Sequence, residues 1–179
     1  MEIRSLRTIG RFGGLMKGMN IMKKRYYLAY GSNLNMSQME KRCPTSRIFG
    51  TATLNGYELL FKGSKTGAYL TIEKKYGGQV PVAVWILSPA DEASLDWYEG
   101  FPDYYYKKDI KVTVKTMSGK TLKVNAFAYI MHENRKLGEP SRHYVRSCQE
   151  GYEKFGFDKF GFDKRLLDEA YERSVSHER

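Results

Sequence analysis

The segment Tyr30-Gly31-Ser32-Asn33-Leu34 is one of two places in the sequence where residue types and spacing could support chemistry. A glycine and two small polar residues follow an aromatic stretch that is expected to form a buried strand. In such a turn, successive backbone N–H groups can converge on one anionic atom, and the side chains of Ser32 and Asn33 add further donors. The segment therefore predicts a cradle for a ligand that carries negative charge, with an ordinary strand-to-helix turn as the alternative.

Glu99 is the second candidate, because it stands immediately before Gly100 at the end of an expected helix. The C-terminus of a helix carries partial negative charge, which disfavours an ionised carboxylate there. The aromatic neighbours Trp97, Tyr98 and Phe101 could also remove water from this carboxylate. Both effects would raise the pKa of Glu99 toward the range that is useful for proton transfer near neutral pH. The alternative is a solvated glutamate at a helix end.

The elements that must position these two segments form a pattern of many strands and few helices. Runs of β-forming residues, separated by turn signals such as Asn55-Gly56 and Gly77-Gly78, predict strands at residues 26–30, 47–54, 57–62, 68–73, 80–87, 104–115 and 121–131. Capping signals predict helices at residues 35–42, 88–98, 141–155 and 163–173. Pro81 should then lie at a strand start or a sheet edge. This order indicates the α+β class, with a small mixed sheet that is curled or barrel-like and short helices around it.

Several kinds of site find no support in the sequence. It contains no phosphate-binding lysine motif and no dinucleotide-binding glycine triplet. His132, His143 and His177 are scattered, so no metal site is expected, and no nucleophile has an evident histidine partner. Cys43 and Cys148 are far apart, which argues against a disulfide framework and fits a reducing, cytoplasmic compartment. No run of about 18 apolar residues occurs, so no membrane span is expected.

The chain is expected to divide into a basic leader, residues 1–22, and a single domain, residues 23–179. The first 25 residues hold seven Lys and Arg residues against one acidic residue, so they carry +6 of the net charge of +10. The leader could bind an acidic surface, act in targeting, or be an upstream extension of the true start, which is the interpretation we favour. Met16, Met19 and Met22 are possible starts, and the leader is expected to be disordered or such an extension. A five-residue tandem copy within Phe155–Lys164 is too short for a solenoid repeat and predicts a longer loop.

Four motifs, in this order, resemble those of the γ-glutamylcyclotransferase-like family, which includes AIG2-like proteins and γ-glutamylamine cyclotransferases. They are Tyr30–Leu34, Leu95–Gly100, Tyr105 ahead of Ile110-Lys111-Val112, and Pro140-Ser141 followed by Tyr144 at the start of a late helix. The resemblance covers about residues 26–171 and implies a small mixed sheet curled into a barrel. The run Tyr104–Tyr106 leaves open whether Tyr105 or Tyr106 faces the pocket, because neighbouring strand residues point to opposite faces.

The resemblance implies an enzyme that cyclises a γ-glutamyl amide to 5-oxoproline and releases an amine or amino acid, without metal or cofactor. It implies Glu99 as the catalytic acid–base residue, Tyr30, Gly31, Ser32, Asn33 and Leu34 as the substrate cradle, and Tyr105 and Tyr144 as pocket-lining hydrogen-bond donors. The expected partner is a small-molecule γ-glutamyl substrate, bound by a monomer or homodimer that engages neither nucleic acid nor membrane. The leaving group stays open. The alternatives are a γ-glutamylamine cyclotransferase acting on isopeptides or biosynthetic side chains, a nucleic-acid-binding protein, and a non-catalytic small-molecule-binding protein of the same fold.

Overall fold

The computed structural model describes residues 24–64, 67–157 and 163–176. The predicted leader, residues 1–22, lies outside the described residues. The same holds for residues 158–162, which include the junction of the tandem copy within Phe155–Lys164. Both interpretations therefore stay predictions.

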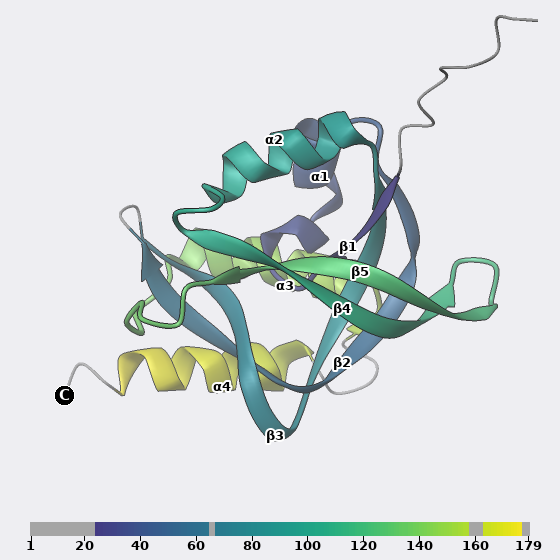
Figure 1. The fold of residues 1–179 in the computed structure, drawn as a ribbon. Helices are drawn as coiled ribbons and strands as arrows, with labels where there is room; N and C mark the ends of the chain where they lie inside the picture. The colour runs from purple at the N-terminus through teal and green to yellow at the C-terminus, as the bar shows by residue number, and fades with distance from the viewer. Residues whose placement is uncertain (1–23, 65–66, 158–162, 177–179) are drawn as a thin grey trace, which may run out of the picture.

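Five strands close into a barrel in the order β1-β3-β2-β4-β5 (Figure 1). They are β1 (Arg25–Ala29), β2 (Arg47–Ser64), β3 (Gly67–Leu87), β4 (Tyr105–Thr116) and β5 (Thr121–Met131). Neighbouring strands are antiparallel except β1 and β5, which pair in parallel at Tyr26–Ala126 and Tyr27–Phe127 and so close the barrel. The predicted α+β class with a curled sheet is confirmed. Strand β1 pairs with β3 on one side and β5 on the other. These pairings fix the position of the end of β1 and therefore of the start of the loop that follows it.

The two longest strands are continuous where the sequence predicts breaks. Strand β2 runs through Asn55-Gly56 and β3 runs through Gly77-Gly78, so the prediction of four short strands here is wrong. The register of β2 against β3 shifts between Asn55 and Tyr57, and Gly56 and Gly77 have φ values of 78° and 71°. Glycine adopts such values easily, and irregularities of this kind bend a strand without ending it. The result is one long, bent hairpin that curls around the barrel.

Pro81 lies inside β3 rather than at its start. It pairs with Thr53 of β2, and it precedes the residues Ala83–Leu87 that pair with β1. Its missing N–H therefore interrupts no ladder with β1, but β3 lies between two strands of a closed barrel, so Pro81 is at neither a strand start nor a sheet edge.

Four helices confirm the four that local signals predict. They are α1 (Met36–Arg42), α2 (Pro89–Glu99), α3 (Arg142–Lys154) and α4 (Asp163–Val175), and a single 3-10 turn, η1 (Ser32–Leu34), joins β1 to α1. The side chain of Asn35 accepts a hydrogen bond from the N–H of Gln38, and Ser88 forms a full capping box with Asp91 at the start of α2. Helix α2 ends at Gly100, which has the left-handed conformation with φ of 62°.

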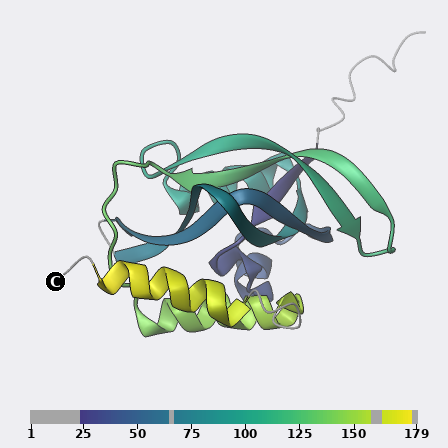
Figure 2. The same ribbon diagram turned by 90° about the horizontal axis from the view of Figure 1, so that it is seen from below.

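The helices cover two sides of the barrel (Figures 1 and 2). Helices α1 and α2 lie together over one side, and α3 and α4 lie side by side beneath another. A Cβ on Gly151 of α3 would lie 2.4 Å from the Cβ of Leu34, so this position requires glycine and holds η1 against α3. Asp96 of α2 accepts hydrogen bonds from Lys107 of β4 and Tyr129 of β5, which fixes the end of α2 on the barrel.

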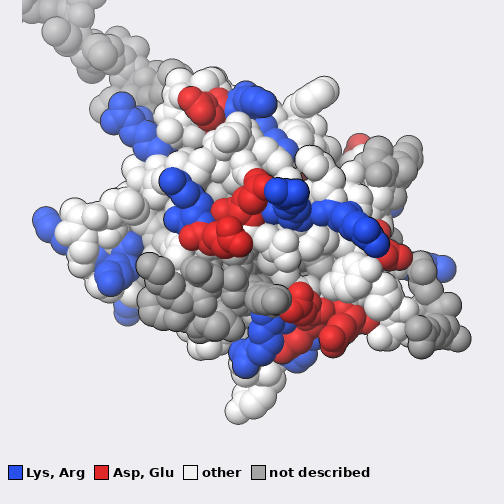
Figure 3. Space-filling model, turned by 180° about the vertical axis from the view of Figure 1, so that it is seen from behind, with Lys and Arg blue, Asp and Glu red and all other residues white. Residues whose placement is uncertain are grey.

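The charged surface is mixed in sign on the face opposite to that of Figure 1. Lys and Arg side chains are interspersed there with Asp and Glu (Figure 3). Among the described residues, Arg25 pairs with Glu92 and Asp109, and Lys75 pairs with Glu58. This face therefore lacks the single-sign surface that is typical of nucleic-acid binding. None of the described helices combines the length and apolar character needed to cross a membrane.

Candidate active site

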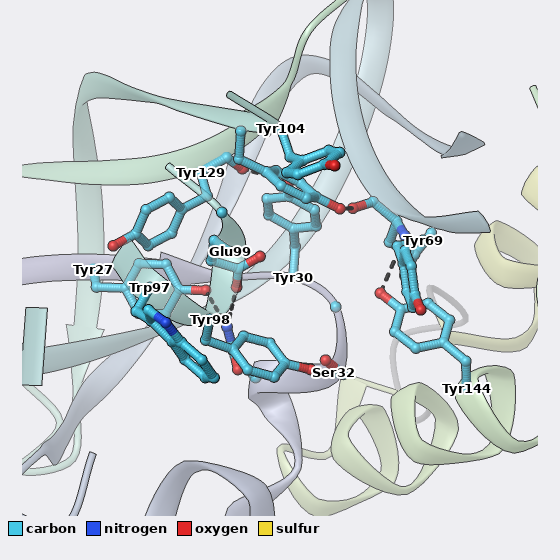
Figure 4. A pocket seen from close by; sticks show the side chains of 15 residues that line it. Tyr27, Tyr30, Ser32, Tyr69, Trp97, Tyr98, Glu99, Tyr104, Tyr129 and Tyr144 are labelled. Atoms are coloured by element: carbon cyan, nitrogen blue, oxygen red, sulfur yellow. Dashed lines mark hydrogen bonds between the residues drawn. The ribbon is translucent and has the colours of Figure 1, made fainter. Parts of the chain in front are cut away.

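A cavity of about 440 Å³ lies between the end of α2, the loop after β1 and the barrel strands (Figure 4). Its walls are mainly aromatic and are formed by Tyr27, Tyr30, Gly31, Ser32, Asn33, Tyr69, Leu70, Trp97, Tyr98, Glu99, Gly100, Tyr104, Tyr105, Tyr129 and Tyr144. Of the predicted site residues, Leu34 alone is not part of these walls. The fold thus brings together residues that are far apart in the sequence, in a cavity of the size that small ligands occupy.

Leu34 belongs to the core rather than to the cavity. Its side chain is fully buried, and its N–H donates a hydrogen bond of 2.9 Å to the carbonyl of Gly31, which closes the η1 turn. This bond corrects the prediction that the N–H of Leu34 helps to hold the substrate. The first N–H groups of a helical turn have no partner inside the turn, which here applies to the N–H groups of Ser32 and Asn33.

Glu99 reaches the cavity from the last turn of α2. The left-handed Gly100 ends the helix by donating its N–H to the carbonyls of Asp96 and Trp97, so Glu99 is held at the helix end. Its carboxylate oxygen Oε1 accepts a hydrogen bond of 2.7 Å from Nδ2 of Asn33 (Figure 4). The two segments singled out in the sequence therefore meet through a direct contact between side chains.

The carboxyl group of Glu99 has an unusual affinity for protons. Loss of water on burial raises its pKa from 4.5 to about 7, while the hydrogen bond from Asn33 and the positive charge of Arg42 act in the opposite direction. The direction agrees with the sequence prediction, and removal of water is its main cause. A carboxyl group with a pKa near neutrality exists in both protonation states and can both accept and donate a proton.

The side chain of Asn33 lines the cavity but donates its hydrogen bonds to other side chains of the site, including Glu99. Asn33 is almost fully buried, and its Nδ2 also donates a hydrogen bond of 2.8 Å to the hydroxyl of Tyr27. Its Oδ1 accepts a hydrogen bond from Arg42. Both polar atoms of this side chain are thus hydrogen-bonded within the protein.

Two tyrosine hydroxyls form the wall opposite Glu99 by holding the backbone of Leu70. Tyr105 donates a hydrogen bond to the carbonyl of Leu70, and the N–H of Leu70 donates one to the hydroxyl of Tyr144, both at 3.1 Å. Tyr105 lines the cavity, whereas Tyr106 donates to Glu133 elsewhere, so the alternation of the strand places Tyr105 in the pocket. The hydroxyl of Tyr105, which donates its proton to Leu70, can accept a hydrogen bond from a ligand.

Sequence reasoning missed part of the cavity and its surroundings. The missed wall residues are mainly aromatic and come from β1, β3, the loop before β4, and β5: Tyr27, Tyr69, Leu70, Tyr104 and Tyr129. No residue spacing in the sequence indicates that these strands meet at the cavity, because the closure of the barrel sets which strands pair. Arg42, which lies behind the wall, carries no signal beyond its place near the end of a short helix. Within the part of the chain that the structure describes, no cluster of three or more His, Cys, Asp and Glu residues could hold a metal ion.

Comparison with known proteins points to one family. The sequence model described as "Gamma-glutamyl cyclotransferase, AIG2-like" matches residues 27–149, more than half of the chain. The γ-glutamylcyclotransferase of Homo sapiens is 33% identical over 127 residues, which are 67% of this chain and 65% of that protein. The Bos taurus protein of the same name is 32% identical over 115 residues, 60% of this chain and 61% of the relative. The chain thus matches somewhat less than two thirds of the length of these relatives.

Solved structures agree with this assignment. A structure described as a γ-glutamyl cyclotransferase superimposes with a TM-score of 0.71 at 28% identity, covering 80% of this chain and 86% of the other. A yeast γ-glutamyl cyclotransferase described as specific to glutathione has a TM-score of 0.58 at 11% identity over 87% of this chain and 97% of the other, which shows the fold alone. Fold and cavity together define a γ-glutamyl cyclotransferase-like protein. The chain belongs to the AIG2-like γ-glutamyl cyclotransferase family.

Proposed function

We propose that this protein cyclises γ-glutamyl amides to 5-oxoproline and releases the amine. The observation that carries the proposal is Glu99, a carboxyl group with a pKa of about 7 that lines the cavity and contacts the loop after β1. The names of the relatives support the same reaction. A reaction that transfers protons to and from nitrogen near neutral pH needs a group of this kind.

The proposed reaction joins two atoms of the same substrate. The substrate's α-amine attacks its own γ-carbonyl carbon, a five-membered ring forms, and the amide C–N bond to the leaving group breaks. Ionised Glu99 accepts a proton from the α-ammonium group, which frees the nitrogen lone pair for attack. Protonated Glu99 then donates this proton to the leaving nitrogen as the C–N bond breaks. The second proton, which the attacking nitrogen loses on becoming an amide, passes through Glu99 to the released amine, which leaves as ammonium. Because the nucleophile is tethered, the protein mainly has to fold the substrate and move protons.

The loop after β1 would bind the negative charge of the substrate. The backbone N–H groups of Ser32 and Asn33 can donate to the α-carboxylate or to the oxyanion that develops on the γ-carbonyl. The hydroxyl of Tyr144 can donate from the opposite wall, next to Leu70. These donors hold the glutamyl part, so that the leaving group extends toward the mouth of the cavity, where Trp97 is 85% exposed.

The charge of the walls favours a second candidate for the leaving group. Among the described residues that line the cavity, Glu99 is the one with a charged side chain, and no Lys, Arg or His is present. A leaving amino acid would bring a carboxylate that finds no cation there, whereas a leaving amine would not. This observation favours γ-glutamylamines as substrates beside γ-glutamyl amino acids.

The proposal is tested by turnover of a panel of γ-glutamyl amino acids and γ-glutamylamines, with 5-oxoproline detected directly. Wild type is compared with Glu99→Gln and with Glu133→Gln, which changes an exposed glutamate outside the cavity. Wild type and Glu133→Gln should release 5-oxoproline, and Glu99→Gln should be slower by about 10²-fold or more while remaining folded. Full activity of Glu99→Gln contradicts the role of Glu99, and no release from any member of the panel contradicts the proposed reaction.

A further inference from the structure

Arg42 stands behind the cavity wall and contacts several parts of the site at once. It is the last residue of α1 and does not line the cavity. Its Nη1 donates hydrogen bonds to Oδ1 of Asn33 and, at 3.4 Å, to Oγ of Ser32. Its Nη2 donates to the hydroxyl of Tyr98 and, at 2.6 Å, to Oε1 of Gln38. One guanidinium group thus joins α1, the loop after β1 and α2.

The guanidinium group is held in place from several directions. Its Cζ lies 3.6 Å from the centre of the Tyr98 ring, so the group stacks on an aromatic side chain that lines the cavity. The backbone carbonyl of Arg42 accepts a hydrogen bond of 2.7 Å from the hydroxyl of Ser94 on α2. A planar group with donors in a fixed fork can satisfy all of these partners, which a flexible ammonium group cannot do in the same geometry.

The contact with Arg42 determines which way the carboxamide of Asn33 points. A carboxamide has an acceptor oxygen on one side and two N–H donors on the other. With Oδ1 on the guanidinium, Nδ2 must face Glu99 and the hydroxyl of Tyr27, as observed. The opposite orientation would place two donors against Arg42 and an oxygen against the Glu99 carboxylate. Arg42 and Glu99 therefore select the same orientation from opposite ends.

We propose that Arg42 is a positioning residue of this site: it fixes the carboxamide of Asn33, and through it the carboxylate of Glu99, in the geometry that proton transfer requires. This inference rests on the proposed function for its meaning in catalysis. Its physical content, the coupling of Arg42 to Glu99 through Asn33, stands on the contacts alone. The positive charge of Arg42 also acts on Glu99 and lowers its pKa, against the effect of burial.

The other ionisable groups around Glu99 do not titrate in the same pH range. The groups whose pKa values are affected by the charge of Glu99 all have raised pKa values, namely the thiol of Cys43 and the hydroxyls of Tyr27, Tyr30, Tyr98, Tyr105, Tyr129 and Tyr144. Near neutral pH these groups stay protonated. A change in the titration of Glu99 on replacement of Arg42 can therefore be assigned to the loss of that arginine.

The test is a titration of the Glu99 δ-carbon by ¹³C NMR, with its signal identified by its loss in Glu99→Gln. In Arg42→Met the pKa of Glu99 should rise above the wild-type value, because a cation and a fixed hydrogen bond are lost. In Arg42→Lys the pKa should stay near the wild-type value, because the charge is kept. The control is Arg173→Met, which removes an arginine that holds the Leu59 carbonyl and Glu58 away from the cavity and should not move the titration.

Kinetics separate the orientation from the charge. In both Arg42→Met and Arg42→Lys, kcat should fall by about tenfold or more while KM changes less, because both variants lose the planar set of guanidinium donors. Only the methionine variant also loses the positive charge. An unchanged titration in Arg42→Met overturns the coupling. If that variant does not fold, Arg42→Lys decides: wild-type kcat in this variant overturns the positioning role. The NMR titration needs no substrate, so failure of the proposed reaction and failure of the coupling are distinguishable.

Discussion

The two ends of the cavity are built in different ways. At the acid end, Glu99, Asn33 and Arg42 are joined side chain to side chain, and Asn33 also contacts Tyr27. At the opposite wall, the hydroxyls of Tyr105 and Tyr144 bind the backbone of a single strand residue. The first arrangement adjusts the proton affinity of one carboxyl group. The second holds a strand in place and shapes the cavity.

The difference shows where the folded molecule gives up stability and where it gains it. Removal of water from Glu99 makes its ionised form unfavourable in the folded state, as its raised pKa shows. The tyrosine wall has the opposite effect, because each hydroxyl satisfies a polar backbone group of Leu70, which is buried. Changes at the acid end should therefore alter rates and pH dependence, and changes at the tyrosine wall should mainly alter the free energy of unfolding and, at Tyr144, the binding of substrate.

The largest effect is expected for Asn33→Leu, which keeps the size of the side chain and removes its polar atoms. Glu99 loses its hydrogen-bond donor, and Arg42 loses its acceptor. The value of kcat/KM should fall by about 10²-fold, and the pKa of Glu99 should rise. One series of kcat/KM measurements at different pH values gives both the fall in kcat/KM and the change in the pKa of Glu99. Wild-type kinetics in this variant would show that the acid end does not depend on its side-chain contacts.

An intermediate effect is expected for Tyr105→Phe and Tyr144→Phe. Each change leaves one backbone group of Leu70 without its partner, which should lower the free energy of unfolding by about 1–3 kcal/mol. Urea denaturation measures this loss. Tyr106→Phe is the control, because the hydroxyl of Tyr106 binds the exposed Glu133 outside the cavity. A shift in the pH profile of turnover in Tyr105→Phe, without a loss of stability, would contradict the expectation that the tyrosine wall mainly stabilises the fold.

The smallest effect is expected in the stability of Glu99→Gln. The pKa of Glu99 is raised from 4.5 to about 7 on folding, so the folded wild type binds more protons than the unfolded chain between these values. Wild type therefore loses stability as pH rises through this window, and the glutamine variant does not. The melting temperature of Glu99→Gln should exceed that of wild type at pH 8 by more than at pH 5. Equal differences at both pH values would contradict the burial of this carboxyl group.

The sequence predicted what local signals determine. Ser88, Asp91 and Gly100 set both ends of α2, so the position of Glu99 at a helix end followed from capping alone. The α+β class and the strand-to-helix transition after Tyr30 followed in the same way. Gly56 and Gly77 misled the strand prediction, because a glycine with positive φ ends a strand in a turn but only bends it in a long hairpin.

What the sequence could not predict depends on contacts between distant segments. The pairing of β1 with both β3 and β5 places Tyr27 and Tyr129 at the cavity, and no spacing in the chain encodes it. The roles of Asn33 and Leu34 differ from the prediction for the same reason. The partner of the Asn33 side chain is Glu99, 66 residues away, and Leu34 packs on Gly151 of α3.

The pH dependence of kcat/KM decides whether Glu99 transfers protons with a pKa near neutrality. The rate of 5-oxoproline formation by wild type should fall on the acid side with a midpoint of about 7, as one carboxyl group becomes protonated. This fall should be absent from any residual activity of Glu99→Gln. A wild-type rate that stays constant between about pH 5 and pH 8, or the same fall in Glu99→Gln, would contradict the account.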